Sequence, residues 1–237
     1  MIAQLQEKEK MIVEGLDFQS LDIMESKTDL WLKKKMGRFS GSEFHRLMGY
    51  EDKEDFPSGA ETYATEKAVE TLLSDPEPSY SNDAMDRGSQ TETESVLHFM
   101  EVTGLKVEKY GEEQEFVELG KHVGCTPDGR IGHDGGIEGK CPNAKTHFFY
   151  LLNLRTAEDL KKHCKNYYWQ CQGNMYVTDS KYWYFFSYDP RFENPKHKML
   201  ILKIERNDED IEKLKRRLKQ AIEFKNKMIR QLNGNGE

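Results

Sequence analysis

The spacing of apolar residues changes its period along this chain, and that change limits the possible fold more than any other feature. Up to about Val102, apolar side chains recur at three- and four-residue intervals, which is typical of amphipathic helices. From Leu105 to Lys140 they alternate in short stretches separated by glycine or charged residues, which predicts strands. Helical spacing returns at Asn143, and two further strands precede a closing helix. Helices before, between and after strands predict an α/β domain.

The expected strands cover residues 105–110, 114–119, 121–126, 128–132, 135–140, 181–189 and 198–205. The expected helices cover residues 28–36, 59–75, 83–102 and 208–232, a short helix after Ser40 or Ser42, and the region 143–177 with breaks near Arg155 and Lys165. The apolar sides expected for the second and third helices are Tyr63, Val69, Leu72 and Leu73, and Val96, Leu97, Phe99 and Met100. Without a repeat or linker, residues 1–237 form one domain, with a helical arm at 1–27 and a frayed tail at 233–237.

The composition suits a globular protein with a well-solvated surface, since 36% of residues are hydrophobic and 32% are charged. No apolar run approaches the roughly 18 residues of a membrane span, and the N-terminal residues are too charged for a signal-peptide core. The four cysteines form no C-x-x-C pair, so we expect reduced thiols that bind no metal, and a cytoplasmic location. A net charge of −7 argues against coating nucleic acid through bulk charge, but not against an enzyme with a basic groove.

Two acids and a lysine stand close together in CTPDGRIGHDGGIEGKCP, residues 125–142. If Asp128 ends one strand and Glu138 lies in the next, a hairpin brings the two carboxylates together, because paired strands lie about 5 Å apart. Glu138 and Lys140 are two residues apart, so they share one face while Ile137 points into the core. Two carboxylates and an ammonium predict a site for a hard cation such as Mg²⁺, where the lysine orients water, or deprotonates it if its pKa is lowered.

The same residues also have an ordinary interpretation. D-G is a common turn, and E-x-K is a common surface pair on a strand. The glycines of this stretch favour the functional interpretation, because they let a phosphate or another backbone approach closely. Taken alone, the spacing leaves both interpretations open.

Further segments make the stretch more specific. P-D-G followed by E-x-K-C-P resembles the PD-(D/E)xK nuclease signature. The other matching segments are WLKKKMGRFSGSEFHRLMG (31–49), MDRGSQTE (85–92), YYWQCQGNMYVT (167–178) and WYFFSYDPR (183–191). In this order, over residues 28–206, the chain resembles the phage-type alkaline exonucleases, a group that includes lambda exonuclease and the YqaJ-type viral recombinases. This resemblance implies a central mixed β-sheet flanked by helices, with a restriction-endonuclease-like core.

The resemblance also implies roles for the acids. Asp128 and Glu138 become metal ligands, and the carbonyl of Gly139 adds an oxygen. Glu92 becomes a further ligand, directly or through water; without the resemblance it is one exposed acid among several on its helix. The cofactor implied is Mg²⁺, with Mn²⁺ as a substitute, and the number of ions stays open.

Other polar residues receive roles in the same way. Lys140 activates or holds the attacking water, and Gln172 holds Lys140 or a phosphate; the alternative for Gln172 is a polar helix face shared with Gln170. The candidates for binding a DNA phosphate are Lys35, Ser42, Thr126 and Lys145. The family carries arginine where Lys35 stands, and lysine lacks the bidentate fork of arginine, so the phosphate pocket departs from the pattern.

The function implied is an exonuclease that degrades linear double-stranded DNA from 5′ to 3′ and leaves 3′ single-stranded tails for phage-type recombination. Its partners are DNA ends, a single-strand annealing protein and further copies in a homotrimer, within a bacterial host cell. The alternatives are an endonuclease of the same superfamily and a non-catalytic DNA-binding subunit. The sequence shows no separate module for reading a DNA sequence, which argues against the endonuclease. All the site residues are present, which argues against the non-catalytic subunit. The basic runs at 161–165 and 213–219 line a DNA groove or form solvated helix faces.

Overall fold

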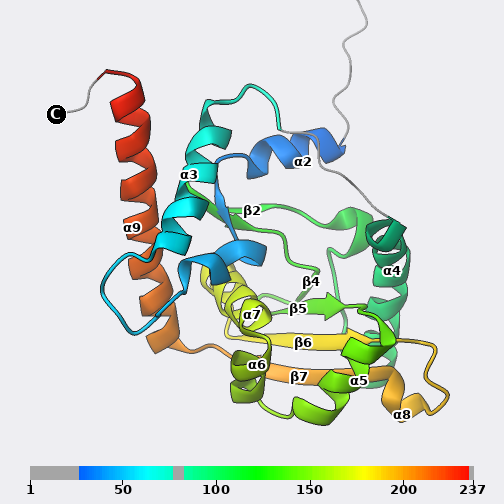
Figure 1. Ribbon diagram of the computed structural model, residues 1–237. Helices are drawn as coiled ribbons and strands as arrows, with labels where there is room; N and C mark the ends of the chain where they lie inside the picture. The colour runs from blue at the N-terminus through cyan, green and yellow to red at the C-terminus, as the bar shows by residue number, and fades with distance from the viewer. Residues whose placement is uncertain (1–26, 77–82, 235–237) are drawn as a thin grey trace, which may run out of the picture.

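The structure, a computed structural model, describes residues 27–76 and 83–234 (Figure 1). The arm expected at 1–27 lies outside these residues except for Lys27, and residues 235–237 of the expected tail also lie outside them. None of the helices within the described ranges is both long and apolar enough to cross a membrane.

The helices and strands follow the expected order, except that the expected strand at 105–110 is absent and the short helices at 111–113 and 195–198 were not expected. The helices are α2 (Lys27–Lys35), the 3-10 helix η1 (Gly41–Leu47), α3 (Ser58–Leu72), α4 (Asp83–Thr103), the 3-10 helix η2 (Gly111–Glu113), α5 (Ala144–Asn153), α6 (Ala157–His163), α7 (Lys165–Thr178), α8 (Pro195–Lys198) and α9 (Asp208–Leu232). The strands are β1 (Phe39–Ser40), β2 (Val117–Leu119), β3 (Val123–Cys125), β4 (Gly129–Ile131), β5 (Gly135–Lys140), β6 (Tyr182–Tyr188) and β7 (Met199–Glu205). The breaks expected near Arg155 and Lys165 separate α5, α6 and α7.

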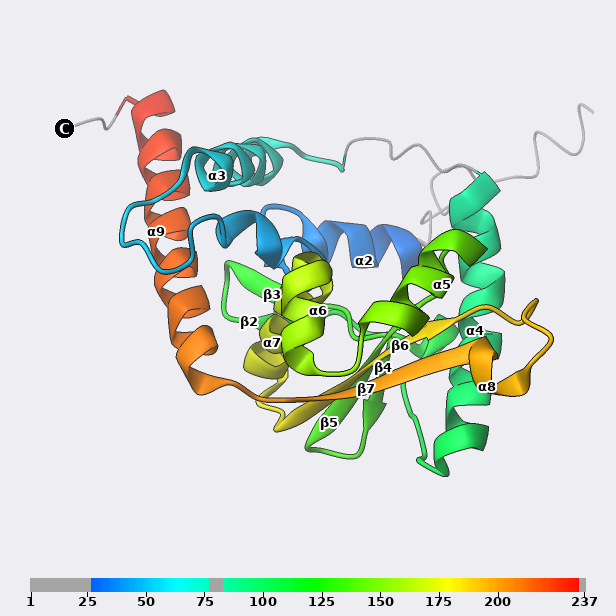
Figure 2. The same ribbon diagram turned by 60° about the horizontal axis from the view of Figure 1, so that its bottom comes forward.

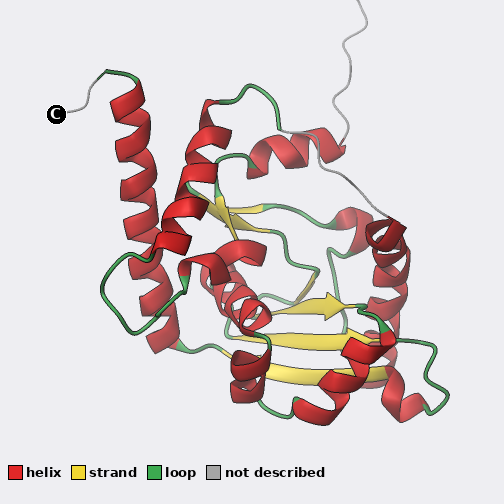
Figure 3. Ribbon diagram, in the orientation of Figure 1, coloured by secondary structure: helices red, strands yellow, loops and turns green. Residues whose placement is uncertain are grey.

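The strands form two small sheets, which Figure 3 shows in yellow. One has the order β1-β3-β2, with β1 parallel and β2 antiparallel to β3. The other has the order β4-β5-β6-β7, in which β5 and β6 are parallel and the remaining pairs are antiparallel. The parallel pair requires a crossover, which α5, α6 and α7 provide. The α/β class with mixed pairing is therefore confirmed, although the strands form two sheets rather than one central sheet.

The four-stranded sheet is covered on both faces, and the alternation of side chains along β6 shows how. Trp183 and Phe185 are fully buried in the core cluster that includes α7. On the opposite face, the ring of Phe99 on α4 lies 5.3 Å from that of Phe186 and 5.5 Å from that of Tyr184. Figure 2 shows α5, α6 and α7 together on one side of this sheet. A strand buried on both faces is apolar throughout, which explains the aromatic run.

Three expectations about local structure are wrong. Residues 105–110 form no strand; Glu108 makes only an isolated bridge to Arg130. On α3 and just after it, Val69, Leu72 and Leu73 are 48%, 47% and 39% exposed, because the buried face of the helix carries smaller residues and Tyr63 instead. On α4, Leu97 is 50% exposed, although Val96 and Phe99 are buried as expected.

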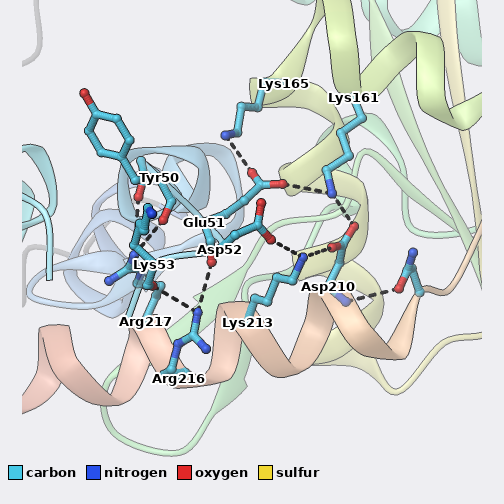
Figure 4. Close-up of polar contacts among 12 residues, drawn as sticks. Tyr50, Glu51, Asp52, Lys53, Lys161, Lys165, Asp210, Lys213, Arg216 and Arg217 are labelled. Atoms are coloured by element: carbon cyan, nitrogen blue, oxygen red, sulfur yellow. Dashed lines mark hydrogen bonds and ion pairs between the residues drawn. The ribbon is translucent and has the colours of Figure 1, made fainter. Parts of the chain in front are cut away.

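The loop between η1 and α3 is held by α9 (Figure 4). Arg217 on α9 is fully buried, and its guanidinium donates to the carbonyls of Tyr50 at 3.0 Å, Lys53 at 2.9 Å and Gly49 at 3.4 Å, and also to that of Asp55. One side chain therefore satisfies carbonyls along the whole loop. A solvated helix face, one of the roles expected for residues 213–219, does not describe Arg217.

Ion pairs fasten the same loop to α6 and α7 (Figure 4). Glu51 lies 2.9 Å from Lys161 Nζ and 2.6 Å from Lys165 Nζ, and Lys161 also contacts the buried Asp210 at 2.7 Å. Lys213 contacts Asp52 at 2.7 Å. Both basic runs thus contribute lysines to internal ion pairs.

Candidate active site

Asp128, Glu138 and Lys140 meet at the β4–β5 hairpin, as strand geometry predicts. Gly129 pairs with Ile137, so Asp128 lies beside Glu138 across the two strands. Asp128 Oδ2 accepts the backbone N–H of Gly139 at 2.8 Å and lies 4.0 Å from Lys140 Nζ. Lys140 forms a direct ion pair with Glu138. Ile137 is fully buried in the opposite direction.

Burial dominates the electrostatics of this group. Glu138 is fully buried and accepts from Asn174 Nδ2 at 3.3 Å. Burial and then the charge of Asp128 raise the pKa of Glu138 to about 8, against the opposing effect of Lys140. Burial also acts to lower the pKa of Lys140, but the carboxylates of Glu138 and Asp128 outweigh it and raise that pKa above its usual range. Lys140 is therefore an ammonium. A general base would need a lowered pKa, so Lys140 does not meet the condition for deprotonating water.

A fourth group reaches the site from α4. Glu92 Oε1 accepts from Gln114 Nε2 at 2.7 Å, which fixes the orientation of the carboxylate. Burial and then the neighbouring charge of Asp128 raise the pKa of Glu92. The carboxylates of Glu92 and Asp128 are therefore close enough to influence each other, and α4 brings Glu92 beside the β4–β5 hairpin.

A cavity of about 220 Å³ opens beside these acids. Its walls are formed by Trp31, Lys35, Ser40, Gly41, Ser42, Glu92, Gln114, Thr126, Asp128 and Gln170. Trp31 Nε1 donates to Thr126 Oγ1 at 3.0 Å, and Lys35 Nζ lies 4.9 Å from the centre of the Trp31 ring. Burial and then the charge of Lys67 lower the pKa of Lys35.

The predicted phosphate-binding residues divide into two groups. Lys35, Ser42 and Thr126 line the cavity that also contains Asp128. Lys145 is exposed in the first turn of α5 and is not part of that wall. The structure thus places three hydroxyl or ammonium donors next to the acids.

The expected contact between Gln172 and Lys140 is absent. Gln172 Nε2 donates to the carbonyl of Glu205 at 2.9 Å, and its Oε1 accepts the N–H of Asn207 at 2.9 Å. Both ends of the amide are thus engaged where β7 leads into α9, and Gln170 lines the cavity instead.

Helical geometry explains this correction. Residues four apart share a helix face, whereas residues two apart point in different directions. Asn174, which contacts Glu138, lies four residues after Gln170 on α7. This spacing was visible in the sequence. Trp31 and Asn174 lie within the family-like segments 31–49 and 167–178, but no role was assigned to them, and Gln114 lies outside every such segment.

A divalent cation suits the donor set. Glu138 and Asp128 are two carboxylates beside a carbonyl at Gly139, and one of them is fully buried. Within the described residues, no three acidic, histidine or cysteine side chains converge to bind a metal by themselves. Mg²⁺ commonly binds one or two carboxylates and completes its shell with water and substrate phosphate, so two carboxylates suffice.

The fold and the acidic hairpin define an α/β protein with a candidate cation site, and comparisons with known proteins specify its family. Over 86% of this chain and 95% of the other, it is similar to an alkaline exonuclease from Laribacter hongkongensis, with 24% identity and a TM-score of 0.72. The structure of that exonuclease in complex with dAMP matches with 25% identity and the same TM-score of 0.72. A phage-related exonuclease from Haemophilus somnus 129PT matches over 82% of this chain and 96% of its own, with 19% identity and a TM-score of 0.65.

The sequence profile of the YqaJ-like viral recombinase domain matches residues 30–181. The chain belongs to that family, and its fold is the PD-(D/E)xK-like fold of the alkaline exonucleases. A search of curated proteins found no match.

Proposed function

We propose that this protein is a Mg²⁺-dependent exonuclease that degrades linear double-stranded DNA from 5′ to 3′ and leaves 3′ single-stranded tails. The observation that carries the proposal is the contact of Asp128, Glu138 and Lys140 beside the cavity lined by Lys35 and Ser42. Family membership and the names of the similar solved structures, all exonucleases, support it.

Each residue of the site has a role in this proposal. Asp128, Glu138 and the Gly139 carbonyl would hold Mg²⁺, and Glu92 would be a further ligand, directly or through water. When bound, Mg²⁺ lowers the pKa of water and neutralises charge on the phosphate. Lys140, which is an ammonium, orients the attacking water and stabilises negative charge that develops on the phosphate.

The cavity wall then binds the end of the DNA. Ser42 and Thr126 donate hydroxyl groups, and Lys35 supplies positive charge to a 5′-phosphate. Gln170 takes the place that Gln172 was expected to hold, as a hydrogen-bonding group for a phosphate or the water. Lys145, on α5, contacts the DNA backbone outside the cavity.

The wider setting is part of the same proposal. The enzyme works in the cytoplasm of a bacterial host during phage-type recombination, together with a single-strand annealing protein. Assembly into a homotrimer belongs to the same proposal. Phe148, Phe149 and Leu152 on α5 are 54%, 42% and 60% exposed and provide an apolar surface against which another protein chain can pack.

Digestion of matched linear and closed circular duplexes tests the function. Linear DNA labelled at either its 5′ or its 3′ end should lose the 5′ label first, only when Mg²⁺ or Mn²⁺ is present, while the closed circle persists. Rapid nicking of the circle would instead indicate an endonuclease. DNA binding without hydrolysis of either substrate would indicate a non-catalytic subunit.

A further inference from the structure

The turn between α2 and β1 is bound by side chains from two other helices. Gly37 has a φ of +66°, and a Cβ there would lie 2.3 Å from Thr71 Oγ1, so this position requires glycine. Its N–H donates to Glu70 Oε2 on α3 at 2.9 Å. Its carbonyl accepts from Lys225 Nζ on α9 at 2.6 Å. Both backbone groups of one residue are thus fixed from outside the turn.

Lys225 is an unusual group to find in this place. Its side chain is 1% exposed, and it reaches Thr71 Oγ1 at 3.4 Å as well as Gly37. Burial, and then the positive charges of Lys121, Lys67 and Arg38, lower the pKa of Lys225 to about 8.

Glu70 gives Lys225 only partial compensation. It is the acid that opposes this lowering of the Lys225 pKa, and it also forms an ion pair with Lys67 at 2.6 Å. A buried ammonium in mostly positive surroundings weakens the fold compared with an apolar residue of similar size. Lys225 therefore acts by fixing the position of the turn that it binds, and not by stabilising the fold.

This turn determines one wall of the cavity. Lys35 lies two residues before Gly37, and Ser40, Gly41 and Ser42 follow shortly after it; all four residues line the cavity beside Asp128. Beyond the turn, the N–H of Ser40 donates to Tyr63 Oη at 3.2 Å, a second anchor on α3. A shift of Gly37 moves Lys35 relative to the acids.

We infer that Lys225 and Glu70 are positioning residues that set the place of Lys35, and through it the preference of the enzyme for DNA ends that carry a 5′-phosphate. The inference rests on the proposed exonuclease function. Neither residue lines the cavity, so neither acts on the substrate directly.

The first test compares initial rates on linear duplexes with a 5′-phosphate or a 5′-hydroxyl at subsaturating DNA. The ratio of the two rates should fall about fivefold to tenfold in Lys225→Met, through a higher KM for phosphorylated ends with kcat retained. Lys227→Met, an exposed lysine on the same helix, and Ile211→Ala, a buried residue at its other end, should keep the wild-type ratio. If Ile211→Ala also loses the preference for 5′-phosphate ends, the loss in Lys225→Met reflects general destabilisation, and the inference is overturned.

Glu70 supplies an independent pair of variants if Lys225→Met does not fold. Glu70→Gln keeps an acceptor for the Gly37 N–H and should retain the 5′-phosphate preference. Glu70→Ala removes the acceptor and should lose it. Equal ratios in the two folded variants would contradict the inference.

A third measurement does not depend on nuclease activity. Trp31 lies beneath Lys35 on α2, and the other two tryptophans, Trp169 and Trp183, are fully buried. Acrylamide quenching therefore reports mainly on Trp31. Quenching should increase in Lys225→Met and Glu70→Ala but not in Ile211→Ala.

Unchanged quenching in the folded variants would overturn the positioning role. If wild-type protein fails to cut DNA, or does not distinguish the two ends, the proposed function or its phosphate pocket fails. The quenching result still decides whether Lys225 and Glu70 place α2.

Discussion

Gly139 donates its backbone N–H to Asp128 Oδ2 over 2.8 Å, and the Nζ atom of Lys140 lies 4.0 Å from the same oxygen. One carboxylate oxygen thus joins strand β5 to the residue that precedes β4, next to the ammonium. The arrangement separates two properties of Asp128, its hydrogen bond to the backbone and its negative charge.

The two properties can be tested with different substitutions. Asp128→Asn keeps an acceptor for the Gly139 N–H but loses the charge, so the fold should be intact while hydrolysis falls by about two orders of magnitude or more. Asp128→Ala and Lys140→Ala should lose a similar amount of activity. Circular dichroism checks folding, and release of labelled nucleotides gives the rate. Near-normal turnover in a folded variant of either residue would remove it from the active site.

The raised pKa of Glu138 predicts that Mg²⁺ binding depends on pH. In the metal-free protein Glu138 keeps its proton in part of the molecules up to about pH 8, and Mg²⁺ must displace that proton. Apparent Mg²⁺ affinity should therefore rise from pH 6 to pH 8, by up to about tenfold per unit for one displaced proton, and then level off. Calorimetric titration in two buffers of different ionisation enthalpy measures the affinity and the proton release. A constant affinity without proton release over this range would contradict the assignment, and Glu138→Gln should abolish the dependence.

Gln170 and Gln172 provide a matched pair on one helix. Gln172→Ala removes the side-chain partner of the part-buried backbone groups of Glu205 and Asn207, so the free energy of unfolding should fall by about 1 kcal/mol while turnover of the folded enzyme is retained. Gln170→Ala should do the reverse, with normal stability and reduced turnover. Urea denaturation and nuclease rates distinguish them. The opposite pattern would restore the catalytic role to Gln172.

Arg217 should contribute more to stability than its neighbour Arg216. Arg217→Met leaves four carbonyls of the loop without their shared donor, so we expect a loss of about 3 kcal/mol in the free energy of unfolding. Arg216 is partly exposed and donates to the carbonyls of Glu51 at 2.9 Å and Lys53 at 3.3 Å, so Arg216→Met should lose about 1 kcal/mol. Urea denaturation of both variants provides the comparison. Equal losses would show that the loop does not depend on the buried guanidinium.

The sequence predicted structure best where one local pattern agrees with packing. The hairpin of β4 and β5 follows from its glycines and alternation, and the apolar β6 follows from burial on both faces. In residues 105–110, apolar and polar side chains alternate for a different reason. Val107 packs in the cluster with Phe99 of α4, and only Glu108 pairs with another strand, so the alternation reflects packing and not a ladder.

Contacts distant in sequence also explain why the sequence did not predict the buried face of α3 or every residue of the site. The main packing partner of α3 is α9, more than a hundred residues away, and the residues of α3 that become buried are Ala60, Ala64 and Ala68 rather than the leucines near the helix end. At the site, hairpin geometry brought Asp128 and Glu138 together from local spacing alone. The groups that arrive from α4, η2 and α2 depend on contacts distant in sequence, which no local pattern encodes.

The contacts of α9 also form late, because they join residues that are far apart in the chain. Lys225 binds Gly37 across a separation of 188 residues, and Arg217 binds Lys53 across 164. Closing loops of this length is entropically costly and slow compared with local helix formation. During synthesis, the contact between Lys225 and the Gly37 carbonyl cannot form until α9 has left the ribosome. A nascent chain that already carries Asp128, Glu138 and Lys140 therefore still lacks the Lys225 contact that fixes the turn before the cavity wall.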